Sequence, residues 1–375
     1  MTLADYHRLL PLQYGKMPLF VKAGARGYPD PRYELLARAL EPFGERVVDL
    51  NPGVGLASAG LLEHSRVDLL ETSRACLRCL ERSFAHHPGA RVRRGLPWEA
   101  EAEAYDQAVL VLPAERGSRY VELALWGAAH SLRPGGRLWI AGDTKRGFET
   151  YFKQAKQRLG YGLIRHRQGS LRVAVLEKEN PTPPVGAPWE SFAAEIWGHP
   201  LRFRHLPGVF SAGHLDPASQ LLLHTLHEDG RAGDVKGCTV LDLGGGYAGL
   251  SLPFAAAGAS VSVAEDDWGS VLSAQASFRA NGLEGRVFHS DVEEALPAAD
   301  RFDIIISNPP FHLGGEVILD VAQAFVQAAR SRLRSGGRFY LVANSFLKYE
   351  PLLEAAFGNL STLRREGYKV LRSEA

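Results

Sequence analysis

The chain contains one sequence pattern twice, and this internal duplication constrains its fold more than any other feature. Four segments of the first half recur in the same order in the second half, and the offset between partners grows only from 193 to 201 residues. The partners are 47–55 and 240–249, 69–71 and 263–265, 105–113 and 302–309, and 132–140 and 333–341. Such an ordered series predicts two domains of one fold, and a chain of 375 residues can give each domain a full core.

Each copy alternates short β-branched runs with longer helical patterns, which is typical of parallel βαβ units. We therefore predict an α/β fold of two tandem Rossmann-like domains, at residues 1–180 and 201–375, joined by a linker at 181–200 whose first part is rich in proline. In the second copy we expect strands near 239–243, 260–264, 286–289, 302–307 and 338–343, with helices such as 249–257, 268–280 and 317–333. The ligands of such a sheet bind beyond the carboxyl ends of its strands.

The two halves differ in charge although the whole chain carries a formal net charge of only +1. Residues 1–180 hold 27 Lys and Arg against 20 Asp and Glu, whereas residues 181–375 hold 16 against 22. The first half has basic clusters at 91–94 and 165–167. A local surplus of positive charge favours a nucleic-acid partner, with solvated arginines on the surface as the alternative.

The sequence shows no sign of a membrane or secreted protein. No apolar run approaches the roughly 20 residues that span a bilayer, and the first residues lack the basic and apolar regions of a signal peptide. We expect a cytoplasmic protein that acts as a monomer.

Two short motifs are similar to parts of metal sites. Cys76 and Cys79 form a lone C-x-x-C within a predicted helix, and His224 and His227 lack the H-E-x-x-H order and a third ligand. We interpret the cysteines as packing residues and the histidines as a polar helix face, and predict no metal site.

The glycine-rich segment 244–249 matches the G-x-G-x-x-G pattern of dinucleotide sites, a match that is weak by itself. Asp242 precedes it, where a carboxylate would repel a pyrophosphate but can orient the ammonium group of S-adenosylmethionine. Glu265 ends the next strand and can accept hydrogen bonds from both ribose hydroxyls. Asp291 follows a third strand and can bind the adenine amino group, while the Val292 N–H donates to the ring. The predicted cofactor residues are thus Asp242, Gly244, Gly246, Glu265, the adjacent Asp266, Asp291 and Val292.

The tetrapeptide Asn308, Pro309, Pro310 and Phe311 directly follows the apolar run 302–307. Asparagine before proline is also a common strand ending, so the tetrapeptide alone is ambiguous. Beside a methyl donor, the amide oxygen of Asn308 and the carbonyl of Pro309 can accept both hydrogens of an aromatic amine, and Phe311 can stack on its ring. We predict that these four residues are catalytic and that Asn308 also borders the cofactor.

The first copy lacks these groups. Residues 112–115 read Leu-Pro-Ala-Glu in place of the tetrapeptide, and the position that matches Asp291 falls near Gly95. We predict that residues 1–180 form a degenerate methyltransferase-like domain that binds RNA or supports the second domain, which is catalytic.

The second half resembles the RsmC-type 16S rRNA guanine-N2 methyltransferases, a class I family that depends on S-adenosylmethionine. The resemblance rests on residues 206–211, 215–216, 219–223, 241–246, 308–312 and 342–347, and on a degenerate amino-terminal domain. It implies methyl transfer to N2 of a guanosine in 16S rRNA, within the small ribosomal subunit or an assembly intermediate. It also implies that Phe210, Ser211 and Gln220 help to close the cofactor pocket. Lys348 departs from the family, whose members often have proline there.

Other functions use the same tetrapeptide chemistry. Adenine-N6 and glutamine-N5 methyltransferases share it, and a large-subunit rRNA is an alternative substrate within the resemblance. A non-catalytic RNA-binding assembly factor is a further alternative, although it would not need Asp242, Glu265, Asp291 and Asn308 together.

Overall fold

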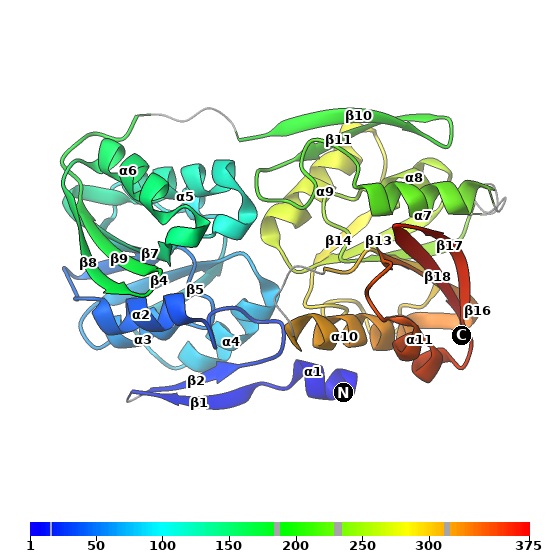
Figure 1. Cartoon of the computed structure of the whole chain (residues 1–375), viewed down its shortest axis with the longest axis horizontal. Helices are drawn as coiled ribbons and strands as arrows, with labels where there is room; N and C mark the ends of the chain where they lie inside the picture. Colours follow the sequence, from blue (N-terminus) through cyan, green and yellow to red (C-terminus); the bar gives the residue numbers. More distant parts are fainter. Residues whose placement is uncertain (16, 184–187, 229–234, 311–315) are drawn as a thin grey trace. The chain divides into compact units, whose positions relative to one another are not determined.

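The structure is a computed structural model that describes residues 1–15, 17–183, 188–228, 235–310 and 316–375. It divides into two compact units (Figure 1). The first unit is Leu9–Pro188, and the second is Trp189–Ala375 together with Met1–Arg8. The expected boundaries therefore need two corrections: residues 1–8 pack with the second unit, and the chain from Trp189 onward already belongs to that unit.

The first unit is a seven-stranded sheet with helices on both faces. Its strand order is β5-β4-β3-β6-β7-β9-β8, in which β9 alone runs opposite to the other six strands and pairs antiparallel with both β7 and β8. The strands are β3 (Arg46–Asp49), β4 (Arg66–Glu71), β5 (Ala90–Arg94), β6 (Tyr105–Val111), β7 (Leu132–Asp143), β8 (Gly162–Gln168) and β9 (Leu171–Glu177), and a hairpin of β1 (Leu10–Tyr14) and β2 (Met17–Val21) precedes them. The helices are α2 (Pro31–Ala39), α3 (Leu56–Leu61), α4 (Arg74–Phe84), α5 (Ser118–Ser131) and α6 (Phe148–Leu159).

Successive side chains of each strand in this unit point to opposite faces of the sheet, so the unit has two apolar cores. Val47 packs with residues of α2, α3 and α4 on one face, whereas its neighbour Val48 packs with residues of α5 and α6 on the other. Cys79 lies in the first core and Cys76 is also fully buried, as expected of packing residues.

The second unit repeats this topology, with strand order β14-β13-β12-β15-β16-β18-β17. Its strands are β12 (Thr239–Leu243), β13 (Ser260–Glu265), β14 (Arg286–His289), β15 (Phe302–Ser307), β16 (Leu333–Asn344), β17 (Ser361–Glu366) and β18 (Tyr368–Glu374). Its helices are α1 (Leu3–His7), α7 (Pro217–Glu228), α8 (Ser251–Ala256), α9 (Trp268–Ala280), α10 (Glu316–Arg332) and α11 (Glu350–Phe357). The five predicted strands and three predicted helices are confirmed, except that residue 333 begins β16 instead of ending a helix. On α7, His224 pairs with Glu228 at 3.0 Å on an exposed, polar helix face, as expected.

Matched glycines show why the two copies fold alike. The strands β7 and β16 have the same length and the same alternation of buried and exposed residues. Each contains a Gly-Gly pair whose first member has a positive φ, 76° at Gly135 and 73° at Gly336. A Cβ atom on Gly136 or Gly337 would lie 2.9 Å from the carbonyl oxygen of Arg133 or Arg334, respectively. Both copies thus need glycine where the strand bends sharply.

A hairpin that the sequence analysis placed partly in the linker also belongs to the second unit. It consists of β10 (Glu190–Ile196) and β11 (His199–His205), and β11 lies along α9. The backbone N–H groups of Arg204 and Leu206 each donate a 3.0 Å hydrogen bond, to Ser277 Oγ and Ser273 Oγ. Serine side chains of α9 thus provide hydrogen-bond partners for backbone N–H groups along the otherwise unpaired edge of β11.

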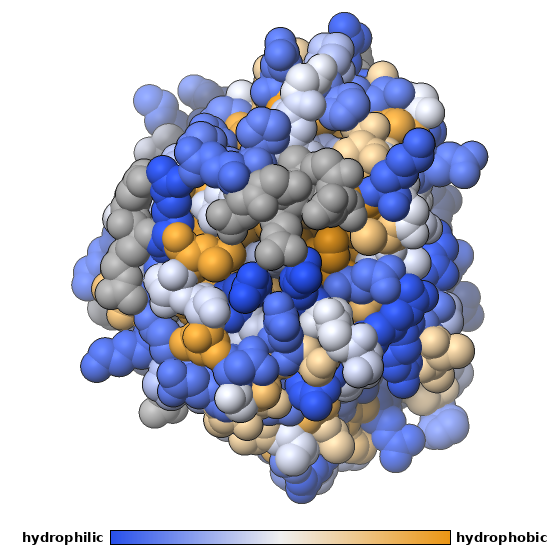
Figure 2. Space-filling model, turned by 90° about the vertical axis from the view of Figure 1, so that its right-hand side faces the viewer, coloured by the Kyte–Doolittle hydropathy of each residue, from blue (hydrophilic) through white to orange (hydrophobic). Residues whose placement is uncertain are grey.

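The surface mixes polar and apolar residues. On the face in Figure 2, the coloured hydrophobic residues form small separate groups among hydrophilic ones. Across the described ranges, no helix combines the length and apolar character needed to cross a membrane.

Candidate functional site

The strand order of the second unit gathers the predicted acids and Asn308 at one edge of the sheet. Asp291 follows β14, Glu265 ends β13, Asp242 lies in β12 and Asn308 follows β15. These four strands are parallel neighbours in that order, so the four residues lie side by side at the carboxyl ends. This is the edge at which ligands bind in open α/β sheets.

The glycine turn after β12 brings its backbone to Glu265. Gly244 and Gly246 have φ values of 72° and 57°, which suit glycine, and the Gly246 N–H donates to Glu265 Oε2 at 2.8 Å. Glu265 Oε1 accepts from the N–H of Asp267 at 3.0 Å. Burial raises the pKa of Glu265, although these two hydrogen bonds act to lower it. The carboxylate is therefore fixed beside the turn, where a ribose would pass.

Asp242 is a fully buried carboxyl group that lacks a hydrogen-bond partner among the described residues. Burial raises its pKa to about 7, although Ser251 lies close enough to lower it. A Cβ atom on Gly245 would lie 2.8 Å from Asp242 Oδ2, so only glycine lets the turn pass this close. A buried acid without a partner is costly, and an ammonium or hydroxyl group of a ligand would remove that cost. The site therefore fits S-adenosylmethionine.

The loop after β14 carries backbone strain at the predicted adenine contact. Val292 has a φ of 59°, a conformation that β-branched residues rarely adopt. The preceding Asp291 is only 1% exposed. Such strain is concentrated at ligand-binding positions, and this turn presents the Val292 backbone and the Asp291 carboxyl together.

Two side chains fix the amide of Asn308. Its Nδ2 donates to Asp216 Oδ2 at 2.9 Å and to Ser219 Oγ at 3.1 Å. Because a carboxylate only accepts hydrogen bonds, the amide nitrogen must face Asp216. No described residue donates to the Asn308 oxygen, which can therefore accept from another molecule. Pro309 is buried and Pro310 exposed, whereas Phe311 lies outside the described residues.

The sequence analysis did not assign Asp216 and Ser219 to the site. Asp216 directly precedes α7 and caps it, since the Ser219 N–H donates to Asp216 Oδ2 at 3.0 Å. The same oxygen also holds Asn308, 92 residues away along the chain. No local signal reveals this second partner, because it depends on how α7 packs against the end of β15.

The other residues predicted for the site form hydrogen bonds mainly with residues close to them in the sequence. Ser211 has a φ of 54° and donates to the carbonyl of His214 at 3.1 Å, while Gln220 Nε2 donates to the Leu215 carbonyl at 2.5 Å. Phe210 is 49% exposed. Residues 210–220 lie near Asn308, because Asp216 in this segment accepts a hydrogen bond from the Asn308 amide. Asp266 follows Glu265, and its carbonyl oxygen lies 2.7 Å from His289 Nε2.

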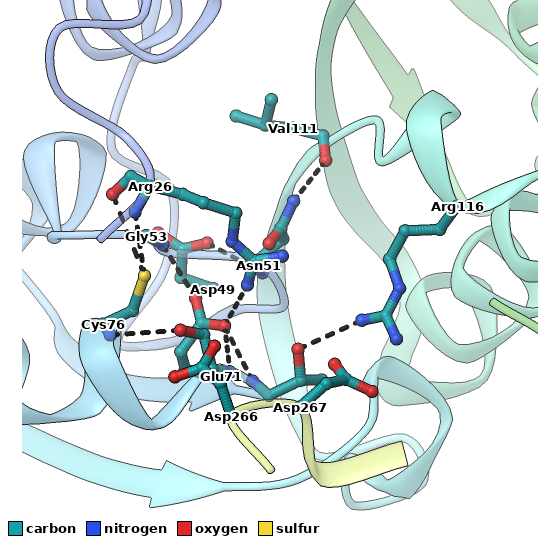
Figure 3. Close-up of polar contacts among 12 residues, drawn as sticks. Arg26, Asp49, Asn51, Gly53, Glu71, Cys76, Val111, Arg116, Asp266 and Asp267 are labelled. Carbon is teal, nitrogen blue, oxygen red and sulfur yellow. Dashed lines mark hydrogen bonds and ion pairs between the residues drawn. The ribbon is translucent and has the colours of Figure 1, made fainter. Parts of the chain in front are cut away.

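In the first unit, the positions that correspond to the predicted cofactor residues of the second unit are bonded to side chains and backbone groups of the first unit itself (Figure 3). Glu71, the counterpart of Glu265, is fully buried and pairs with Arg26. It also accepts from the N–H groups of Gly53, Thr72 and Ser73 at 2.7–3.0 Å. Asn51 Nδ2 donates to the Val111 carbonyl at 2.9 Å. A ribose would therefore have to displace the partly buried guanidinium of Arg26 from Glu71.

Comparisons with known proteins agree on one family. The sequence model of the "Methyltransferase small domain" family matches residues 200–372. The ribosomal RNA small subunit methyltransferase C of Pseudomonas entomophila is 31% identical over 92% of this chain and 99% of its own length. The protein of the same name from Pseudomonas putida KT2440 is 32% identical with the same coverage. The structure of the T. thermophilus enzyme RsmC, described as a 16S rRNA N2 methyltransferase of guanosine 1207 in complex with AdoMet and guanosine, is 55% identical. It covers all of both chains with a TM-score of 0.96.

Proposed function

This chain belongs to the RsmC family of small-subunit ribosomal RNA methyltransferases, and from that premise we propose how its residues carry out the reaction. It is an S-adenosylmethionine-dependent rRNA guanine-N2 methyltransferase. The reaction takes place in the second unit. The orientation of the Asn308 amide, fixed by Asp216 and Ser219, is the observation that carries this assignment.

The carboxyl edge of the second sheet holds the cofactor. Asp242 would bind the ammonium end, Glu265 would accept from the ribose hydroxyls, and Asp291 with the Val292 N–H would bind the adenine. The order of these residues along the edge, with Asp242 next to Asn308, supports this assignment, because it brings the methionine end near the catalytic amide. S-adenosylmethionine supplies an electrophilic methyl group on a sulfonium.

Asn308 makes the guanine amine nucleophilic by holding its hydrogens. The amine is a poor nucleophile because its lone pair is delocalised into the ring. When the Asn308 oxygen and the Pro309 carbonyl accept its two hydrogens, the lone pair is turned toward tetrahedral geometry and aimed at the methyl group. Catalysis is then mainly orientation, which can supply up to about 7–11 kcal/mol. No strong base is needed, since the methylated nitrogen is positively charged and readily releases one proton to solvent water.

The target is the guanosine equivalent to 1207 of 16S rRNA, and the substrate is the small subunit or an assembly intermediate. The identity of 55% with the T. thermophilus enzyme along the whole chain supports the same nucleotide. The first unit contributes RNA binding. Its exposed Arg91 and Arg167 support this role, whereas Arg93 and Arg165 already pair with Asp68 and Glu41.

Mass spectrometry of nuclease-digested rRNA tests the function directly. Cells that lack the protein should lose N2-methylguanosine at this one position of 16S rRNA, and the intact gene should restore it, whereas a gene encoding Asn308→Ala should not. Unchanged 16S rRNA, or a loss in 23S rRNA, would contradict the substrate. Purified protein with naked rRNA, 30S subunits or precursor particles would then identify the form that is methylated.

A further inference from the structure

The first residues of the chain form part of the second unit. The helix α1 begins with a capping box, in which Thr2 Oγ1 accepts from the Asp5 N–H at 3.1 Å and the Asp5 carboxylate accepts from the Thr2 N–H at 3.1 Å. Tyr6 is 3% exposed, and α1 packs against α10 (Figure 1). A buried aromatic side chain and a capped start anchor this short helix, so the next residue, His7, has a defined position.

His7 bridges two acids of the predicted adenine loop. Its Nδ1 lies 3.3 Å from Asp291 Oδ2, and its Nε2 lies 3.3 Å from Glu293 Oε2. The side chains of His7, Asp291 and Glu293 are 17%, 1% and 9% exposed. Burial disfavours the charged imidazole, but the hydrogen bonds and charges of the two acids outweigh it and raise the pKa of His7 to about 9. The ring is therefore protonated at neutral pH and donates from both nitrogens.

The residue between the two acids is the strained Val292. Its φ of 59° turns the backbone sharply, and the bridge from His7 holds the side chains on either side of this turn. A strained turn persists only when its surroundings fix it. His7 reaches this turn from the other end of the chain.

We propose that His7 is a positioning residue that holds the 291–293 turn in the conformation that recognises the adenine base of the cofactor. The proposal rests on the proposed function, which places adenine at Asp291 and Val292. Asp291 then accepts from the adenine amino group with its carboxylate held by His7, and the strained Val292 N–H is directed to the ring. The amino-terminal helix thereby becomes part of the specificity of the catalytic unit.

Equilibrium binding to the full-length protein tests this. The ligands are S-adenosylhomocysteine and S-inosylhomocysteine, whose base carries an oxygen in place of the amino group. We expect His7→Ala to bind the adenosyl ligand about tenfold more weakly, the scale of one charge-assisted hydrogen bond. Because the inosyl ligand does not use the Asp291 acceptor, its affinity should change less, so discrimination between the two ligands should fall. Arg8→Ala, which alters an exposed neighbour paired with Asp5, should change neither affinity.

Two amide variants separate the contacts of the imidazole. The amide nitrogen of His7→Asn corresponds to Nδ1 and can keep the bond to Asp291, whereas that of His7→Gln corresponds to Nε2 and can keep only the bond to Glu293. His7→Asn should therefore retain more discrimination than His7→Gln. Equal discrimination in all variants, or tighter binding of the adenosyl ligand by His7→Ala, would overturn the proposal, since tighter binding means that His7 competes with adenine. If the unaltered protein bound neither ligand, the proposed function itself would fail.

Discussion

Replacing Asn308 by aspartate should make methyl transfer depend on pH in a way that reports on Asp216. In the protein, the amide nitrogen of Asn308 donates to Asp216 Oδ2 at 2.9 Å. The substitution Asn308→Asp is nearly isosteric but puts a second carboxyl oxygen at that position. When both carboxyl groups are ionised they repel. When one proton lies between them, an O–H donor replaces the amide N–H, and the other oxygen still accepts from the guanine amine.

The distance sets the size of this effect. Two charges 2.9 Å apart repel by about 6 kcal/mol at an effective dielectric constant of about 20. Both side chains are partly exposed, so we halve this value to about 3 kcal/mol. This energy corresponds to about two pKa units, which moves the pKa of the introduced carboxyl group from about 4 to about 6. Because the protonated form is the active one, activity is present below that pKa and is lost as pH rises through it.

Single-turnover transfer of a tritiated methyl group to rRNA, measured from pH 5.5 to 7.5, tests the reasoning. The rate of Asn308→Asp relative to the unaltered enzyme should be about 20-fold higher at pH 5.5 than at pH 7.5, from the protonated fraction at a pKa of about 6. The double variant Asn308→Asp with Asp216→Asn is the matched control. Its new amide can donate to the introduced carboxyl group and still cap α7, so its relative rate should not depend on pH.

A flat relative rate for the single variant would refute the close contact with Asp216. A double variant with the same pH dependence as the single one would show that a group other than Asp216 is responsible.

The other predictions concern each part of the site. Asn308→Ala should slow methyl transfer at least about 100-fold while cofactor affinity stays within a few-fold, as tritium transfer and calorimetry would show. The raised pKa of Asp242, about 7, means that the folded protein binds a proton that the unfolded chain releases, so stability without cofactor should fall as pH rises from 4 to 7. Asp242→Asn should therefore stabilise the protein at pH 8 by about 2–4 kcal/mol in urea denaturation and abolish the gain in stability on adding cofactor. Arg26→Ala should destabilise the first unit by about 3–5 kcal/mol, because Glu71 stays buried without its partner, and equal stability would contradict that pairing. Arg91→Glu should weaken RNA binding and reduce its salt dependence by about one phosphate contact, and an unchanged slope would exclude this arginine from the interface.

Local pattern predicted strands and helices of the second copy because the five predicted strands form the parallel, largely buried part of its sheet. Apolar β-branched runs such as 302–307 lie between helical segments, and the matching segment of the first half predicts the same element independently. The hairpin of β10 and β11 was missed, since its sequence follows a proline-rich stretch and its edge is satisfied by serines of α9 about 70 residues away. Residues 1–8, which include α1, were placed in the first domain for a similar reason, because packing against α10 leaves no local signal.

The sequence by itself determined that the chain has two related α/β domains, which of them carries the Asn-Pro-Pro-Phe tetrapeptide predicted to be catalytic, and which acids end its strands. These properties depend on residue type and order along the chain, and strand topology then follows from the rules for parallel sheets. Only the tertiary structure decided which side chains position the site residues. In the second unit Asp216 orients Asn308 and His7 bridges Asp291 and Glu293, and in the first unit Arg26 pairs with Glu71. Each of these contacts joins residues far apart in sequence, with geometry set by the packing of whole elements, so no local pattern encodes it.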